Sequence, residues 1–215
     1  MILADPKTRE EWLDSRKKGI GGSDAACILG LNKYKTNVEL WRQKALNEKP
    51  PDISDKPAVW YGKHAEEHIR ALYMLDNPLN EYDYHEFRMY ANEEYPFIYA
   101  TLDGEITEIN GKKGILEIKT TTIQNQNQWK EWDERIPENY YVQVLHQLLA
   151  TGWEFVELAA YIRYYHNDEL RASYRTYRIN RKDVEEELEY LKNKEIEFWK
   201  SVTSKQEPPL VLPEI

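Results

Sequence analysis

The sequence predicts an α/β protein of one domain, spanning residues 1–215. Residues 97–102 indicate a strand, because the apolar positions Ile, Ala and Leu alternate with Tyr and Thr at the period of a half-buried strand. Capping patterns of the Thr-x-x-Glu type, which begin at Thr8 and Thr36, indicate helices. A length of 215 residues is enough for one substantial hydrophobic core.

The first third of the chain is expected to be mostly helical, with helices over residues 8–16, 24–29, 36–46 and 58–75. Thr8 begins the first helix as part of a capping box, and Leu13 is expected on the buried face of that helix. Ser23 is expected to cap the second helix, and Gly30 to end it. In the fourth helix, Trp60 is expected to face the core.

The rest of the chain is expected to combine strands with two long helices. The strands are expected over residues 83–90, 97–102, 105–109, 114–120, 154–164 and 173–179. The helices are expected over residues 138–151, ended by Gly152, and 181–202. Asn110-Gly111 is expected to join two neighbouring strands, because this dipeptide favours the positive φ angles of tight hairpins.

The composition limits the compartment and the kinds of site. With seven Trp and sixteen Tyr, the mean hydropathy of -0.80 does not indicate disorder. The single cysteine, Cys27, excludes a disulfide framework and a four-cysteine zinc or iron–sulfur site within one chain. The single cysteine fits a location in the reducing cytoplasm. No stretch reaches the roughly 18 apolar residues of a membrane span, so we expect no membrane partner.

The net charge of -9 argues at first against a nucleic-acid partner, since phosphate binding needs Lys and Arg. The charge is, however, spread unevenly along the chain. Basic residues gather at 16–18 and again at Lys33 and Lys35, whereas residues 183–189 are mostly acidic. An acidic exterior with a locally basic channel is consistent with this distribution.

The stretch around Glu117-Ile118-Lys119 is the first candidate site. Residues two apart on a strand share a face, so Glu117 and Lys119 are expected to point the same way. If Asp103 lies beside them, two carboxylates and one ammonium converge, which suits Mg²⁺ or Mn²⁺ and an attacking water. Acidic-x-basic triplets also occur elsewhere, for example at Asp5, so the spacing alone leaves a plain surface salt bridge as an alternative.

Several motifs occur together and in a fixed order along the chain. They are Arg16-x6-Ser23 after a helix that bears Trp12, Gly62-x3-Glu66, Thr101-x-Asp103, Glu117-Ile118-Lys119 and Gln143-x3-Gln147. Together with the segment Gly19-Ile-Gly-Gly-Ser-Asp-Ala-Ala-Cys-Ile-Leu-Gly-Leu-Asn-Lys-Tyr34, they make residues 8–165 resemble the YqaJ-type phage recombinases. These are relatives of lambda exonuclease within the PD-(D/E)xK nuclease superfamily. Leu102 stands where the superfamily name has Pro, a position at which many members vary.

The resemblance implies a fold and an activity. The fold is a restriction-endonuclease-like core, a central mixed β-sheet flanked by helices. The activity is metal-dependent 5′-to-3′ exonuclease digestion of one strand of linear double-stranded DNA from its 5′-phosphorylated end, in phage-type single-strand-annealing recombination. The resemblance also implies two Mg²⁺ ions per active site, which Mn²⁺ could replace, a single-strand-annealing recombinase as partner, and a homotrimeric ring.

The resemblance assigns roles residue by residue. The catalytic residues are Asp103, Glu117 and Lys119. The metal ligands are Glu66, Asp103, Glu117 and the backbone carbonyl of Ile118. The residues that bind the 5′-phosphate are Arg16, Ser23 and Thr101. Gln143 is expected to have a positioning role.

Other functions stay open at this point. A related endonuclease would carry the same residues, whereas a Cas4-like nuclease is disfavoured because it usually needs four cysteines. A catalytically inactive DNA-end-binding module would be expected to lack one of the catalytic residues. A phosphate-binding metabolic protein is disfavoured by the absence of a Walker motif and of a dinucleotide fingerprint. The histidines form no clear metal motif and are expected to be structural or exposed: His64, His68, His85, His146 and His166.

Overall fold

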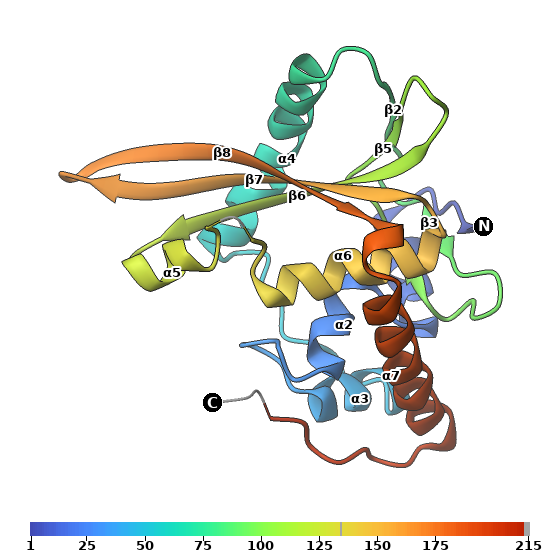
Figure 1. The fold of residues 1–215 in the computed structure, drawn as a ribbon. Coiled ribbons are helices and arrows are strands. Elements are labelled where there is room, and N and C mark those ends of the chain that lie inside the picture. The colour runs from blue at the N-terminus through green and yellow to red at the C-terminus, as the bar shows by residue number, and fades with distance from the viewer. Residues whose placement is uncertain (134, 213–215) are drawn as a thin grey trace.

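The computed structural model describes residues 1–133 and 135–212 (Figure 1). Its strands are β1 (Ile2–Ala4), β2 (Glu81–Asp83), β3 (Met89–Ala91), β4 (Tyr99–Ala100), β5 (Gly104–Thr107), β6 (Lys113–Ile123), β7 (Phe155–His166) and β8 (Glu169–Asn180). Its α-helices are α1 (Arg9–Ser15), α2 (Gly22–Ile28), α3 (Asn37–Ala45), α4 (Pro57–Asp76), α5 (Gln126–Lys130), α6 (Glu138–Thr151) and α7 (Glu185–Ser204). Two short 3₁₀ turns, Arg16–Lys18 and Arg181–Asp183, follow α1 and precede α7.

The centre of the molecule is a five-stranded mixed sheet in the order β2-β5-β6-β7-β8. Only β6 and β7 run parallel, and α6 is part of the long connection that such a pair requires. A second, three-stranded sheet has the order β1-β3-β4 and leads directly into the large one. The chain bends at Asp103, between β4 of the small sheet and β5 of the large sheet.

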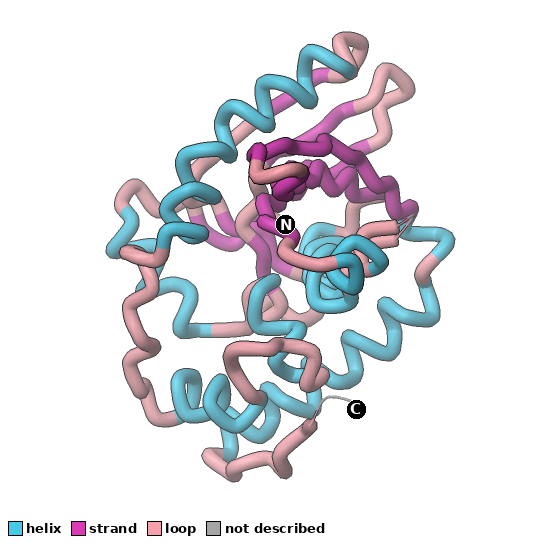
Figure 2. The backbone as a smooth tube through the Cα atoms, turned by 90° about the vertical axis from the view of Figure 1, so that its left-hand side faces the viewer, coloured by secondary structure: helices cyan, strands magenta, loops and turns pink. Residues whose placement is uncertain are grey.

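The large sheet is covered by helices on both faces (Figure 2). On one face, Ile115 of β6 and Leu158 of β7 belong to the apolar cluster that includes Leu145 and Leu148 of α6. On the other face, Leu116 and Ile118 of β6 belong to the cluster that includes Ile69 and Tyr73 of α4. Because β6 is buried on both faces, a charged side chain on it needs a specific partner.

The extent of strand pairing creates the free edge at which the candidate site lies. β5 pairs with β6 only from Thr107 opposite Lys113 to Gly104 opposite Leu116, while β6 continues to Ile123 alongside β7. Beyond Leu116, the β5 side of β6 is therefore open to side chains from other elements.

Several expected elements differ in the structure. The single strand expected over 83–90 is replaced by β2 and β3, which belong to different sheets, and the strand over 97–102 shrinks to the two residues of β4. The reason is that the chain changes sheets twice in this region, which a pattern of alternating residues does not reveal. The helices over 138–151 and 58–75 are confirmed within two residues at each end.

Three side chains also differ from expectation. Gly21 is the N-cap residue of α2, so Ser23 lies within the first turn of that helix and does not cap it. Leu13 is exposed because α1 lies at the surface and buries none of its residues fully. Trp60 is also exposed, with its ring stacked on His64.

No helix in the described ranges is long and apolar enough to span a membrane.

A buried ion pair joins α6 to α7. His146 Nδ1 lies 2.6 Å from Glu195 Oε1, and His146 Nε2 lies 2.8 Å from the carbonyl oxygen of Tyr99. Both partners are acceptors, so the imidazole carries both protons. Burial lowers the pKa of His146, but Glu195 and the Tyr99 carbonyl raise it by more, so the pKa lies above its usual value.

This ion pair should make the free energy of unfolding fall as the pH becomes alkaline. A raised folded-state pKa means that the stabilisation is fully present below the unfolded value of 6.5 and is lost as pH rises through the folded-state pKa. We expect the free energy of unfolding, measured by urea denaturation between pH 6 and about pH 10, to fall across this range. The variant His146→Gln should be less stable at pH 6 and should show a flatter pH dependence. An identical slope in both proteins would contradict the assignment.

Candidate active site

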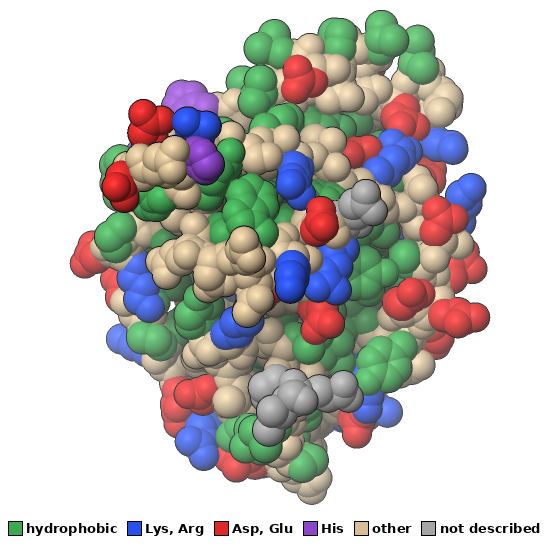
Figure 3. All heavy atoms as spheres, turned by 60° about the vertical axis from the view of Figure 1, so that its left-hand side comes forward, with side chains coloured by type: hydrophobic (Ala, Val, Ile, Leu, Met, Phe, Trp, Pro, Cys, Tyr) green, Lys and Arg blue, Asp and Glu red, His purple; other side chains and the backbone are tan. Residues whose placement is uncertain are grey.

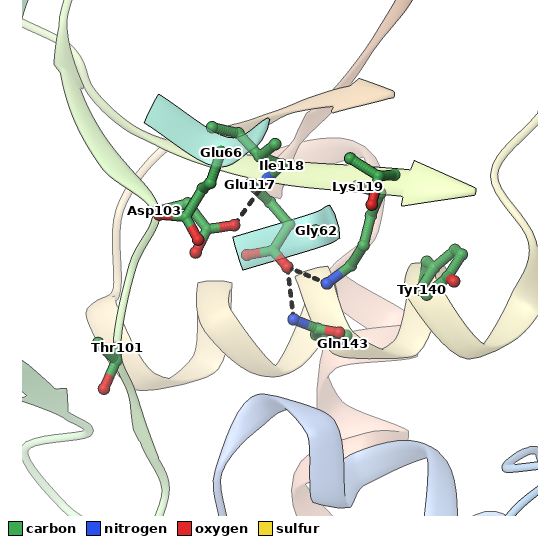
Figure 4. Close-up of a pocket in the computed structure, with 10 residues that line it drawn as sticks. Gly62, Glu66, Thr101, Asp103, Glu117, Ile118, Lys119, Tyr140 and Gln143 are labelled. Carbon is green, nitrogen blue, oxygen red and sulfur yellow. Dashed lines mark hydrogen bonds and ion pairs between the residues drawn. The ribbon is translucent and has the colours of Figure 1, made fainter. Parts of the chain in front are cut away.

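The candidate site is a cavity of about 340 Å³ at the open edge of β6 (Figure 4). Its walls come from α4, the bend before β5, the middle of β6 and the first half of α6. The residues that line it are Gly62, Glu66, Thr101, Asp103, Glu117, Ile118, Lys119, Thr120, Tyr140 and Gln143. Most of the residues expected in the site therefore meet in one place, although they come from positions between Glu66 and Gln143 of the sequence.

Asp103 is fixed at the bend between the two sheets. Its Oδ2 accepts a hydrogen bond of 2.8 Å from the backbone N–H of Ile118, and its own carbonyl accepts one of 2.6 Å from Arg70 Nε. Burial raises the pKa of Asp103 well above its usual value, and the nearby carboxylates of Glu117 and Glu66 raise it further. The site therefore concentrates negative charge that the protein compensates only in part.

Glu117 is held by three donors. Its Oε1 accepts from Lys119 Nζ at 2.5 Å and from Gln143 Nε2 at 2.5 Å, and its Oε2 accepts from Gln147 Nε2 at 2.5 Å. Gln143 and Gln147 are four residues apart on α6, so they present their amides from the same helix face. This explains how a carboxylate that is only 2% exposed remains satisfied.

Lys119 shares the face of β6 with Glu117, as the two-residue period predicts. Burial lowers the pKa of Lys119, but the carboxylates of Glu117 and Asp103 raise it by more, and the net pKa is raised. The ammonium therefore stays charged over the physiological range. Its Nζ also lies 5.3 Å from the centre of the Tyr140 ring, within the range of a cation–π contact.

Glu66 reaches the cavity from α4. Its Oε1 lies 2.5 Å from an Arg70 nitrogen, one turn along the same helix. Burial raises the pKa of Glu66, Arg70 opposes that shift, and Glu117 adds to it. Gly62 lets the helix approach β6, because a Cβ at this position would lie 3.2 Å from Thr120 Oγ1.

The donor set suits a hard divalent cation. Asp103, Glu117 and Glu66 offer carboxylate oxygens, which Mg²⁺ and Mn²⁺ prefer. The N–H and C=O of a strand residue point to the same edge, so the Ile118 carbonyl lies on the Asp103 side of β6. Burial raises the pKa of Asp103 and the carboxylates of Glu117 and Glu66 raise it further, and a bound cation would offset this carboxylate charge.

The three carboxylates do not converge on one point in the structure. Glu117 is engaged by Lys119 and the two glutamines, and Glu66 is engaged by Arg70. Among the described residues, a tight group of Asp, His and Glu ligand atoms, all within 4.8 Å, occurs instead at Asp83, His85 and Glu105.

This second group is a candidate metal site of mixed ligands, outside the cavity. Asp83 and Glu105 face each other on β2 and β5, with His85 Nε2 2.8 Å from Asp83 Oδ2 and 3.9 Å from Glu105 Oε1. A protonated His85 would also compensate the two carboxylates. The sequence did not predict this group, since Asp83 and His85 were expected on one strand and Glu105 on another with no known pairing.

The residues expected to bind a 5′-phosphate lie in a connected chain beside the cavity. Arg16 donates to Ser23 Oγ at 3.2 Å, and its guanidinium lies 4.6 Å from the centre of the Trp12 ring. Trp12 Nε1 donates to Thr101 Oγ1 at 2.9 Å. Of the three expected residues, Thr101 lines the cavity, whereas Arg16 and Ser23 lie outside its lining.

The family of the chain follows from its similarity to known proteins. The sequence model of the YqaJ-like viral recombinase domain matches residues 11–154. The chain belongs to this family. It is also 40% identical over 148 residues to the uncharacterized protein YqaJ of Bacillus subtilis (strain 168), a match that covers 69% of this chain and 44% of that protein. The YqaJ-like chain thus matches less than half the length of this relative.

Solved structures confirm the expected fold class. The alkaline exonuclease LHK-Exo from Laribacter hongkongensis matches with a TM-score of 0.69 and 19% identity over 92% of this chain and 94% of that one. LHK-Exo in complex with dAMP matches with a TM-score of 0.65 and 20% identity over the same shares of 92% and 94%. A phage-related exonuclease from Haemophilus somnus 129PT matches with a TM-score of 0.58 and 13% identity over 87% of this chain and 96% of that one. The YqaJ-like chain therefore has the fold of the phage-type alkaline exonucleases.

Three residues of the site were not predicted as site residues. Gln147 holds the second oxygen of Glu117, Arg70 holds Glu66 and the Asp103 carbonyl, and Tyr140 lines the cavity next to Lys119. The spacing of Gln147 from Gln143 was a usable signal, because positions i and i+4 lie on one helix face. No sequence signal connects Arg70 to Asp103, since that contact depends on how α4 crosses the sheet.

Neutralising Asp103 should stabilise the YqaJ-like chain when metal is absent. Because the Asp103 pKa is raised on folding, its ionised form disfavours the folded state, and Asp103→Asn removes the charge while keeping an acceptor for Ile118 N–H. We expect a Tm gain of at least about 2 °C at pH 8 in EDTA, roughly 1 kcal/mol for a protein of this size.

A matched variant and added metal make this test specific. Asp14→Asn removes an exposed carboxylate that pairs with Lys17, so it should give no gain in Tm. Added Mg²⁺ should raise the Tm of the parent more than that of Asp103→Asn. A lower Tm for Asp103→Asn in EDTA would show that the charge is already compensated.

Proposed function

We propose that this chain is a metal-dependent deoxyribonuclease that degrades one strand of linear double-stranded DNA from a 5′-phosphorylated end in the 5′-to-3′ direction. The observation that carries the proposal is the meeting of Asp103, Glu117 and Lys119 in one cavity of a YqaJ-like chain. We further propose that residues 1–215 act as one nuclease domain in phage-type single-strand-annealing recombination.

Glu66, Asp103, Glu117 and the Ile118 carbonyl would hold Mg²⁺, two ions per site, with Mn²⁺ as a substitute. When bound, such ions would neutralise charge on the scissile phosphate and activate a water for in-line attack. The proposal is supported by the oxygen-only donor set and by the uncompensated charge at Asp103.

The roles of the protein side chains follow from their contacts. Lys119 would use its ammonium to orient the attacking water, since its charge persists beside Glu117. Gln143 would position Glu117 through the hydrogen bond to Oε1, and Gln147 would do the same through Oε2. Because each oxygen of Glu117 has its own amide donor, the carboxylate can exchange Lys119 for a cation without losing its orientation.

Arg16, Ser23 and Thr101 would bind the terminal 5′-phosphate. A guanidinium matches two phosphate oxygens at once, and the hydroxyls of Ser23 and Thr101 add single hydrogen bonds. The contact of Arg16 with Ser23 and the link from Trp12 to Thr101 support a common binding region. Its position beside the cavity is consistent with cleavage one or a few nucleotides from the end.

The acidic net charge does not exclude a DNA substrate. On the face shown in Figure 3, basic and acidic side chains are intermixed, so this face is not uniformly acidic. A homotrimeric ring with DNA at its centre and a single-strand-annealing partner are further parts of the proposal. They rest on the family resemblance.

Digestion of defined DNA tests the reaction type. We expect Mg²⁺-dependent loss of the 5′-phosphorylated strand of a linear duplex, no cutting of a covalently closed circle, and no activity in EDTA. Lys119→Ala should lower the rate by about 10² or more, the usual contribution of a group that acts on the nucleophile. The control is Lys17→Ala, which removes an exposed lysine paired with Asp14. Cutting of the circle would indicate an endonuclease, and end binding without digestion would indicate an inactive module.

End selection tests the role of Arg16. We expect the parent to prefer 5′-phosphorylated over 5′-hydroxyl ends, and Arg16→Ala to reduce the ratio of the two kcat/KM values by about tenfold or more, the worth of a charge-assisted hydrogen bond. The ratio for Arg16→Lys should lie between those of the parent and Arg16→Ala, because an ammonium lacks the planar fork of a guanidinium. If Arg16→Ala keeps the ratio of the parent, another residue selects the phosphate.

A further inference from the structure

The main chain of Arg16 is held by two side chains from distant parts of the sequence. Its carbonyl oxygen accepts a hydrogen bond of 2.9 Å from Lys44 Nζ on α3 and one of 2.5 Å from the Tyr99 hydroxyl on β4. Both donors reach the start of the turn formed by residues 16–21, which separates α1 from α2. The backbone position from which the Arg16 side chain projects is therefore fixed by contacts that do not involve its guanidinium.

The same lysine also fixes the other end of the turn, through Asp24. Lys44 Nζ lies 2.9 Å from Asp24 Oδ2, and that oxygen accepts a hydrogen bond of 3.2 Å from the backbone N–H of Gly21. Lys35 contributes a second cation at 3.4 Å from Asp24 Oδ1. Lys44 and Asp24 thus form a clamp that joins α3 and α2 to both ends of the turn.

The middle of the turn is attached to the small sheet. Ile20 N–H donates to the Phe97 carbonyl at 2.7 Å, and the Ile20 carbonyl accepts from Tyr99 N–H at 3.1 Å. Gly19 permits this approach, because a Cβ there would lie only 2.3 Å from the Phe97 carbonyl oxygen. The turn is consequently fixed at its start, its middle and its end.

The clamp is hard to explain by stability alone. The side chains of Lys44 and Asp24 are only 9% and 5% exposed, and burying two charges carries a large desolvation cost before their attraction is counted. Burial lowers the pKa of Lys44, and Asp24 opposes that shift. Apolar side chains of similar volume often give equal or greater stability at such positions, so a role in fixing geometry accounts better for the pair.

We propose that Lys44, together with Asp24 and the Tyr99 hydroxyl, positions Arg16 for selection of the 5′-phosphate. This inference rests on the proposed function of Arg16. Lys44 does not itself contact the DNA end; it acts by holding the carbonyl of Arg16, while Trp12 and Ser23 hold the guanidinium. The two sets of contacts fix the same side chain at its base and at its tip.

The test compares phosphorylated and hydroxyl ends in three variants of the full chain. Lys44→Met removes the ammonium and keeps most of the side-chain volume. Tyr99→Phe removes only the hydroxyl that donates to Arg16, changes no charge, and therefore reports on geometry alone. Lys17→Met is the matched control, because Lys17 adjoins Arg16 in sequence but pairs with Asp14 at the surface.

The ratio of kcat/KM for phosphorylated over hydroxyl ends is the deciding measurement, since partial unfolding would lower both rates equally. We expect this ratio to fall by about tenfold in Lys44→Met, as for a misplaced binding group, by less in Tyr99→Phe, and not at all in Lys17→Met. If Lys44→Met does not fold, the result for Tyr99→Phe decides.

Two results would overturn the inference. A ratio unchanged in both Lys44→Met and Tyr99→Phe, in a parent that prefers phosphorylated ends, would show that the clamp is only structural. A parent without any preference for phosphorylated ends would instead remove the proposed role of Arg16, and the inference with it. The parent alone therefore distinguishes the two failures.

Discussion

The hydrogen-bonded Glu117 carboxylate is the interaction on which the arrangement of the site depends. It is nearly inaccessible to solvent, it lies on a strand that is buried on both faces, and it is surrounded by three donors from two elements. An isolated carboxylate in such surroundings would be neutral or would disrupt the core. The amides of Gln143 and Gln147 satisfy the oxygens of the Glu117 carboxylate and so join α6 to β6 at this point. These two hydrogen bonds therefore add to the apolar packing of α6 on the sheet and at the same time orient a carboxylate of the site.

The open edge of β6 is the second requirement. Were β5 to continue past Gly104 as a regular partner, its backbone would occupy the space that Asp103 uses to accept from the Ile118 N–H. The bend at Asp103 ends the pairing and puts a carboxylate in place of the next ladder hydrogen bond. Arg70 then holds the carbonyl of Asp103 and the carboxylate of Glu66 together, so α4 is linked to the bend by one side chain. Partial pairing of the strands creates a cavity within an otherwise continuous sheet.

The sequence was sufficient for the parts of the molecule governed by local chemistry. The two-residue period of β6 correctly placed Glu117 and Lys119 on one face, and the Thr36 capping box and the glycine at 152 correctly marked helix ends. It was insufficient where the chain passes from one sheet to the other, because β3 and β4 are short and the third strand of their sheet, β1, lies near the start of the sequence. For the same reason, Arg70 and the group at Asp83 could not be predicted, since each depends on which elements become neighbours.

The segment from Tyr99 to Asp103 explains how the two halves of the site are held at a fixed separation. Its first residue donates to the Arg16 carbonyl and accepts from His146, while Thr101 accepts from Trp12 and lines the cavity. Its last residue accepts from Ile118 beside the proposed metal ligands. The backbone of a five-residue extended stretch spans at most about 17 Å, so this segment keeps the proposed phosphate-binding region close to the cavity. Under the proposed function, this segment would therefore set the distance between the DNA end and the bond that is cut.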